Sequence, residues 1–100
     1  KTFEFTLSGI TTTHQFTWMP QSISFQSAQG AASDPLPPFA TWLYQPAALD
    51  QYIPQQPMPL HLNLWLFQGA APTNGQEVEI VITRFAFTPL RRVYLPIVLK

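Results

Sequence analysis

The chain has 100 residues, of which 46% are hydrophobic and only 10% are charged, and its five basic and five acidic residues cancel. This length suits one small domain, and without a Lys/Arg surplus we expect no nucleic-acid partner. The absence of cysteine excludes a disulfide framework and a thiolate nucleophile, and no apolar run approaches the ~20 residues of a membrane span. Ten Thr and ten Gln supply the polarity, which suits a neutral ligand such as a sugar.

The first predicted elements are strands, because eleven prolines are scattered along the chain between runs of β-branched and aromatic residues. Residues 2–8 alternate apolar and polar side chains and predict a strand that ends at Gly9. Residues 15–19 and 22–25 predict two further strands, joined by a turn at Pro20-Gln21 into a hairpin.

The middle of the chain is richer in loop signals. Residues 26–38 contain Ser, Ala, Gln, Gly, Asp and Pro and predict a long loop. Residues 39–45 predict a strand that ends at Pro46, and residues 46–59, with four prolines, predict irregular structure.

Residues 60–67 carry the clearest strand pattern of the sequence. One face of this strand would hold Leu60, Leu62, Leu64 and Leu66, and the other would hold His61, Asn63, Trp65 and Phe67. The leucine face predicts core, whereas the second face sets an imidazole, an amide and two aromatic rings in one row.

The remaining residues predict a turn and two more strands. Residues 69–75 predict the turn, with Asn74-Gly75 as its strongest signal. Residues 78–87 predict a long strand, and residues 90–100 predict a tail or edge strand centred on 93–99.

Three segments, in order, resemble glycoside hydrolase family 16, the concanavalin A-like group of laminarinases, lichenases and xyloglucan enzymes. The run THQFTWMPQSI at residues 13–23 resembles that family's His-x-Tyr-x-x-x-Trp-x-Pro-x-x-Ile hairpin. The run PMPLHLNLW at residues 57–65 is similar to its Pro-Met-x-Leu-x-x-Asn-Leu-Trp strand, and residues 79–87 take the place of its closing strand. The resemblance implies an all-β fold, an antiparallel β-sandwich of the concanavalin A-like jelly-roll type, with residues 1–100 as a single domain or half-domain.

The departures from the family concern catalysis. The family hairpin ends in Trp-Tyr-Val-Asp-Gly, whereas residues 25–30 read FQSAQG. The family's catalytic Glu-x-Asp-x-x-Glu strand lies upstream of the hairpin and has no counterpart here. The resemblance therefore implies part of a polysaccharide-binding cleft without the catalytic carboxylates, so we predict no catalytic residue within the chain.

The best candidate substrate-binding residues are His61, Asn63 and Trp65, because sugars stack on aromatic rings while amides and imidazoles bind their hydroxyls. The alternative for Trp65 is packing under a missing or partner strand. Trp42, beside the proline-rich loop, is a secondary candidate, although a cross-strand packing role suits it too.

Other chemistry is poorly supported by the sequence. Glu77 and Glu79 would lie ~6.5–7 Å apart on one strand face, but they follow a turn and predict a solvated strand start. His14 and His61 lack metal-ligand spacing and predict hydrogen bonding instead. We expect no metal and no cofactor.

Three functions stay open at this point. The first is part of a secreted, extracellular carbohydrate-active protein that binds a polysaccharide or oligosaccharide and pairs with its own upstream half or with a second copy. The second is a non-catalytic carbohydrate-binding module, and the third is a structural or assembly β-domain without a ligand.

Overall fold

The computed structural model describes residues 1–34 and 36–89. The chain divides into two compact units, Lys1–Leu60 and His61–Lys100. None of the helices among the described residues has the length and apolar character that a membrane crossing requires.

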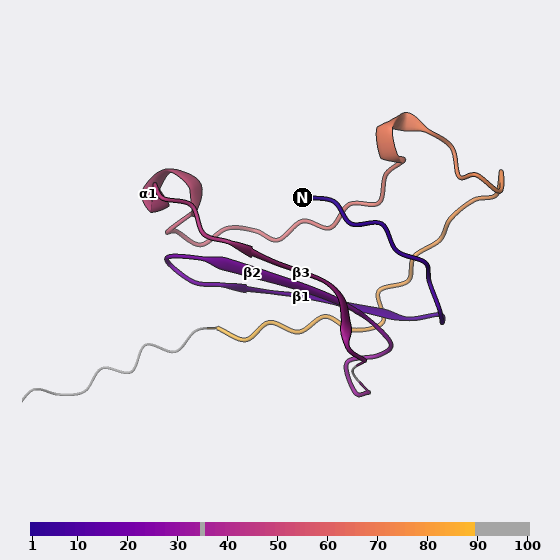
Figure 1. Ribbon diagram of the computed structural model, residues 1–100, viewed down its shortest axis with the longest axis horizontal. Helices are drawn as coiled ribbons and strands as arrows, with labels where there is room; N and C mark the ends of the chain where they lie inside the picture. The colour runs from indigo at the N-terminus through magenta and orange to yellow at the C-terminus, as the bar shows by residue number, and fades with distance from the viewer. Residues whose placement is uncertain (35, 90–100) are drawn as a thin grey trace, which may run out of the picture. The chain divides into compact units, whose positions relative to one another are not determined.

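The first unit is built around a three-stranded antiparallel sheet with the order β1-β2-β3 (Figure 1). The strands are β1 (Thr12–Trp18), β2 (Ile23–Gln29) and β3 (Pro38–Tyr44). β1 and β2 pair along their whole length, from Thr12 opposite Gln29 to Trp18 opposite Ile23. The predicted hairpin is therefore confirmed, and both of its strands are longer than the sequence pattern indicated.

A tight turn joins β1 to β2 at the predicted place. The backbone N–H of Met19 donates to the carbonyl of Ser22 over 2.9 Å, which closes the turn around Pro20 and Gln21. Pro20 fits here because proline has no backbone N–H to donate and its position in the turn requires none. This turn sets the pairing register of β1 and β2. Because side chains alternate between the two faces of the sheet, each residue of β1 shares a face with its partner on β2.

β3 confirms the predicted strand at 39–45 with a shift of one residue, and it carries a β-bulge. Ser27 pairs with Ala40 but Ala28 pairs with Pro38, so Phe39 is the extra residue of the bulged strand. Pro38 is tolerated because it begins β3, which lies at the edge of the described sheet.

The loop between β2 and β3 begins at Gly30, where the chain takes a left-handed conformation with φ of 87°. The N–H of Gly30 donates to the carbonyl of Thr11 (2.8 Å), and its carbonyl accepts from the hydroxyl of Thr13 (2.8 Å). A Cβ at this position would lie 3.2 Å from the carbonyl oxygen of Asp34. The predicted loop at 26–38 therefore starts only at Gly30, because residues 26–29 belong to β2.

The strand predicted at residues 2–8 is wrong, because these residues make no backbone ladder. They are held to the first unit by side chains instead. The amide of Gln29 donates to the carbonyl of Thr6 (2.8 Å) and accepts from the N–H of Ser8 (3.4 Å). The ring of Phe5 stacks on that of Phe39, with the centroids 4.3 Å apart.

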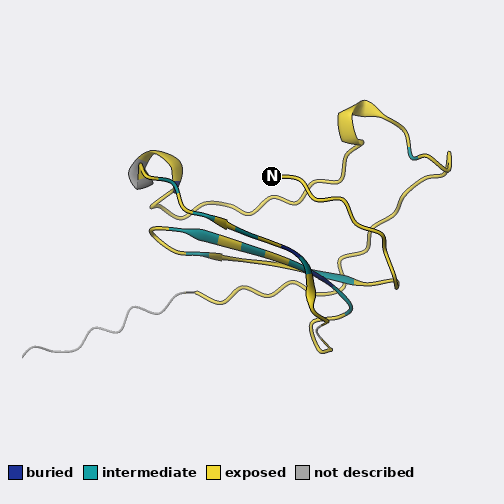
Figure 2. Ribbon diagram, in the orientation of Figure 1, coloured by how far each residue is buried: buried dark blue, intermediate teal, exposed yellow. Residues whose placement is uncertain are grey.

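The proline-rich segment after β3 is irregular, as predicted, apart from a single helical turn, α1 (Leu49–Tyr52). Ile53, which follows it, is the most buried large side chain described, with 1% of its surface exposed. The amide of Gln55 donates to the carbonyl of Pro20 (3.0 Å), which ties this segment to the β1–β2 turn. Figure 2 shows that burial is concentrated on the sheet, and that most of the rest is exposed.

The described residues of the second unit contain no strand. Its regular structure there is a short 3-10 turn, η1 (Phe67–Gly69), with left-handed conformations at Gln68 and Gly69. The predicted turn at 69–75 is confirmed, since Gly75 N–H donates to the carbonyl of Pro72 over 2.9 Å. The strands predicted at 60–67 and 78–87 are wrong for the chain as described, because no neighbouring strand pairs with either. The strand predicted at 93–99 lies outside the described residues.

The fold class is thus a small all-β region, with a three-stranded antiparallel sheet and almost no helix. The finer prediction, a concanavalin A-like sandwich, stays a prediction.

Candidate functional site

The two faces of the β1-β2-β3 sheet differ sharply in chemistry. On one face, aromatic rings from all three strands form an aromatic row. The aromatic row consists of Phe16, Phe25, Trp42 and Tyr44. Phe25 and Trp42 stand opposite each other on β2 and β3, and their rings stack at 5.2 Å with 17° between the planes.

Each ring of the aromatic row lies close to the next ring in the row. Phe16 lies 6.0 Å from Phe25, and Tyr44 lies 5.4 Å from Trp42. Such cross-strand aromatic pairs stabilise a sheet by up to about 1 kcal/mol each. The expectation that Trp42 is a cross-strand residue is therefore confirmed, and its indole is half-buried against Phe25.

On the same face, beyond the aromatic row, an imidazole is hydrogen-bonded to two hydroxyl groups. The imidazole of His14 contacts the hydroxyl of Ser27 through Nδ1 (2.8 Å) and that of Thr12 through Nε2 (2.9 Å). His14 therefore has the hydrogen-bonding role that the sequence predicted. Because both ring nitrogens face hydroxyls, the imidazole lacks the orienting carboxylate that activates a serine nucleophile.

The opposite face of the sheet is polar and exposed. This polar face consists of Gln15, Thr17, Ser24, Gln26 and Thr41, together with Leu43. They form two cross-strand rows, one with Gln26 between Gln15 and Thr41, and one with Ser24 between Thr17 and Leu43. Because neighbouring strands lie ~4.8 Å apart, each row is a closely spaced line of hydrogen-bonding or apolar groups.

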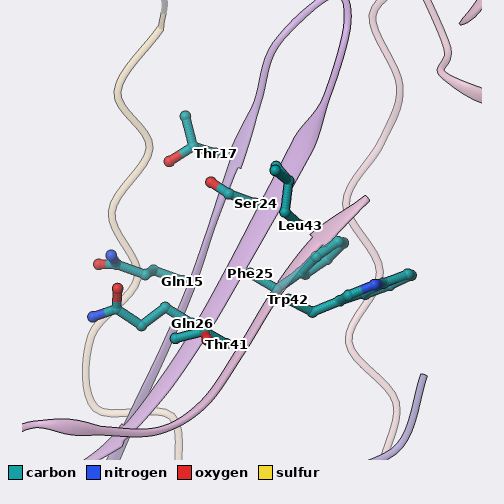
Figure 3. Close-up of a pocket in the computed structure, with 8 residues that line it drawn as sticks. All are labelled: Gln15, Thr17, Ser24, Phe25, Gln26, Thr41, Trp42 and Leu43. Carbon is teal, nitrogen blue, oxygen red and sulfur yellow. The ribbon is translucent and has the colours of Figure 1, made fainter. Parts of the chain in front are cut away.

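A shallow depression of about 370 Å³ covers the polar face (Figure 3). Phe25 and Trp42 also border it, but their side chains point to the opposite side of the sheet. A second depression, of about 220 Å³, adjoins the first because Gln15 and Gln26 line both. Ala32 and Leu36, from the loop after β2, line its far end.

The predicted substrate-binding residues are divided between the two units. Trp42 belongs to the first unit, whereas His61, Asn63 and Trp65 belong to the second. All three of the latter are exposed, and Trp65 exposes 82% of its surface. The role of all four residues in binding stays a prediction.

The charged side chains of the described residues assemble no second type of site. Glu77 and Glu79 are both exposed, as expected for carboxylates that follow a turn. Over residues 1–34 and 36–89, no group of three His, Asp or Glu side chains gathers closely enough to hold a metal ion.

The comparisons with known proteins leave the family open. No protein-family model, curated protein or solved structure significantly matches this sequence. The resemblance to glycoside hydrolase family 16 therefore stays a hypothesis based on three short segments.

The polar face was not predicted from the sequence. Its signal was present, since Gln15, Thr17, Ser24 and Gln26 alternate with the apolar residues of the hairpin. Such a pattern is also that of any solvated sheet face. Only the register of β3 shows that Thr41 and Leu43 extend the same surface.

Proposed function

We propose that this chain is part of a secreted, polysaccharide-active protein of the family 16 type. In this proposal it contributes a glycan-binding surface, centred on Trp65, and the catalytic carboxylates lie outside it. The observation that carries the proposal is the exposure of Trp65, at 82%, beside two exposed polar side chains at alternate positions, His61 and Asn63.

The chemistry of these groups suits a neutral sugar. An exposed indole offers a flat apolar face for the C–H groups of a pyranose ring. An amide both donates and accepts hydrogen bonds, and a neutral imidazole does the same through its two nitrogens. Together they match the mixture of apolar wall and few polar groups that is typical of ligand sites.

The same proposal includes a protein partner that covers the leucines of this segment. Leu60, Leu62, Leu64 and Leu66 expose between 47% and 66% of their surfaces. A run of exposed apolar side chains with free backbone groups favours pairing with another strand. We propose that the partner is either an upstream half of the same protein or a second copy of the chain.

Calorimetric titration with laminarin, lichenan and xyloglucan oligosaccharides tests the binding role. We expect Trp65→Ala to weaken binding at least tenfold, which corresponds to about 1.4 kcal/mol. Val81→Ala is the matched control, because Val81 is also an exposed apolar side chain of the second unit, and it should leave binding unchanged. A folded Trp65→Ala protein that binds as tightly as the wild type would refute the assignment.

The wild-type chain should release no reducing sugar from these glucans, because a glycosidase needs an acid and a base in different environments. Hydrolysis that is abolished by Glu79→Gln would overturn this part of the proposal. If the wild-type chain binds none of the oligosaccharides, the structural or assembly function is favoured instead.

A further inference from the structure

The polar face of the sheet is a surface that the proposed function leaves without a role. We infer that it is a second glycan-contact surface, which binds an uncharged polyhydroxylated chain independently of Trp65. The inference rests on the proposed function only in taking the ligand to be a glycan.

The first observation is that the hydrogen-bonding groups of the polar face are free. Among the described residues, none of the side chains of Gln15, Gln26 and Thr41 makes a hydrogen bond within the protein. By contrast, the amides of Gln29 and Gln55 are used internally. Two free amides therefore stand side by side on β1 and β2 and present donors and acceptors outward.

The second observation is the shape of this surface. The two depressions over the polar face share Gln15 and Gln26 and so form one shallow groove. Leu43 lines one end of it, and Ala32 and Leu36 line the other. A linear ligand would thus meet hydrogen-bonding groups in the middle and apolar contacts at both ends, as in many ligand sites.

The third observation is the absence of charge. Among the residues that the structure describes, no Asp, Glu, Lys or Arg lines either depression, so a phosphate or a carboxylate would find no ion-pair partner in this part of the chain. A protein partner would require an apolar or aromatic centre in the contact, and the aromatic row lies on the opposite face of the sheet. An uncharged chain of hydroxyl groups is the occupant that fits.

The test follows the side-chain amide signals of the full ¹⁵N-labelled chain during titration with laminarin and lichenan oligosaccharides. We expect the signals of Gln15 and Gln26 to shift together and to saturate. The signals of Gln51 and Gln56, which are exposed glutamines of the same unit outside the groove, should stay in place.

Variants separate this surface from the one at Trp65. The double substitution Gln15→Ala with Gln26→Ala should weaken binding at the groove at least tenfold, whereas Gln51→Ala with Gln56→Ala should not. In Trp65→Ala the shifts at Gln15 and Gln26 should persist. Their loss in Trp65→Ala would mean one shared site and would overturn the inference of a second surface.

Two further outcomes would also overturn the inference. One is the absence of shifts at Gln15 and Gln26 at millimolar oligosaccharide, which would leave the proposal for Trp65 intact. The other is an equal shift of the Gln15 and Gln26 signals when sorbitol replaces the oligosaccharide at the same hydroxyl concentration. That result would show weak solvation of a sheet face and not recognition of a glycan.

Discussion

Residues 12–44 and residues 60–87 alternate apolar and polar side chains in the same way, yet only the first stretch forms a sheet. In the first stretch, two residues between Met19 and Ser22 reverse the chain, so that β2 finds its partner a few residues away. In the second stretch, Gln68 and Gly69 form a left-handed turn after the extended run. This turn does not reverse the chain so that it pairs with that run. Alternation therefore marks a segment that can become a strand, and a partner edge decides whether it does.

The two regions also differ in how they treat their apolar side chains. In the sheet, Phe25 and Trp42 cover each other and are half-buried. In the second region, Leu62, Ile80 and Phe87 are all more than half exposed. The second region carries the composition of a core, and among its described residues no layer covers these side chains, which is why a partner is part of the proposed function.

The largest expected effect is a difference in backbone protection between the two regions. Amides of β2 bond to strands on both sides, whereas those of 60–66 have no ladder partner among the described residues. We expect β2 amides to exchange with solvent at least about a hundredfold more slowly than those of 60–66 in the isolated chain, because exchange follows local opening. Hydrogen exchange measured residue by residue checks this.

Sedimentation of the same sample shows whether pairing removes that difference. We expect protection of 60–66 to rise with protein concentration if a second copy supplies the edge. A well-folded monomer at high micromolar concentration, with 60–66 already protected, would contradict the proposal. It would indicate a small closed sandwich and favour the binding-module function.

The next effect concerns the aromatic row. Trp42→Ala removes the stack with Phe25 and should destabilise the sheet by about 2 kcal/mol, less than the 3–5 kcal/mol of a fully buried tryptophan because the ring is half-buried. Leu43→Ala, one residue away on the opposite face, should change the stability by less than about 0.5 kcal/mol. The opening free energy of the β2 amides measures both. Equal losses in the two variants would show that the two faces contribute alike.

The smallest effect concerns the loop after β2. Gly30→Ala places a Cβ in a left-handed conformation, 3.2 Å from the carbonyl oxygen of Asp34, and should cost about 1–2 kcal/mol of sheet stability. Gly9→Ala is the control, because a Cβ there meets nothing within 4 Å. The opening free energy of the β2 amides again measures the effect. A Gly30→Ala protein as stable as the wild type would show that the loop can refold around the new side chain.

The hairpin and β3 could be predicted because their signals are local. The alternation around Phe16 and Phe25, with Pro20 between them, predicts two strands and a turn. The extension of β2 to Gln29 could not be predicted, since the residues at 27–29 resemble loop composition and only their pairing with residues 12–14 makes them strand. The segment at 60–67 was misjudged for the converse reason, because its pattern is strong and its partner is not among the described residues.

The two candidate sites also differ in how far each can be predicted from a single stretch of sequence. Trp65 is visible in the sequence because it alternates with leucines, and its exposure is the property that a binding role needs. The polar face depends on three strands in register, and no single stretch of sequence contains it. Surfaces assembled across strands are thus harder to predict than surfaces that one strand carries alone.

The aromatic row also gives the protein its own optical probes. Two rings held 5.4 Å apart at a fixed tilt, as Trp42 and Tyr44 are, transfer excitation from phenol to indole and give a near-ultraviolet dichroism signal while the sheet is intact. The indole of Trp65 lies in solvent and emits at longer wavelength. One unlabelled sample therefore carries a chromophore pair and a further indole, Trp18, on the sheet, and an exposed indole that reports contact at Trp65.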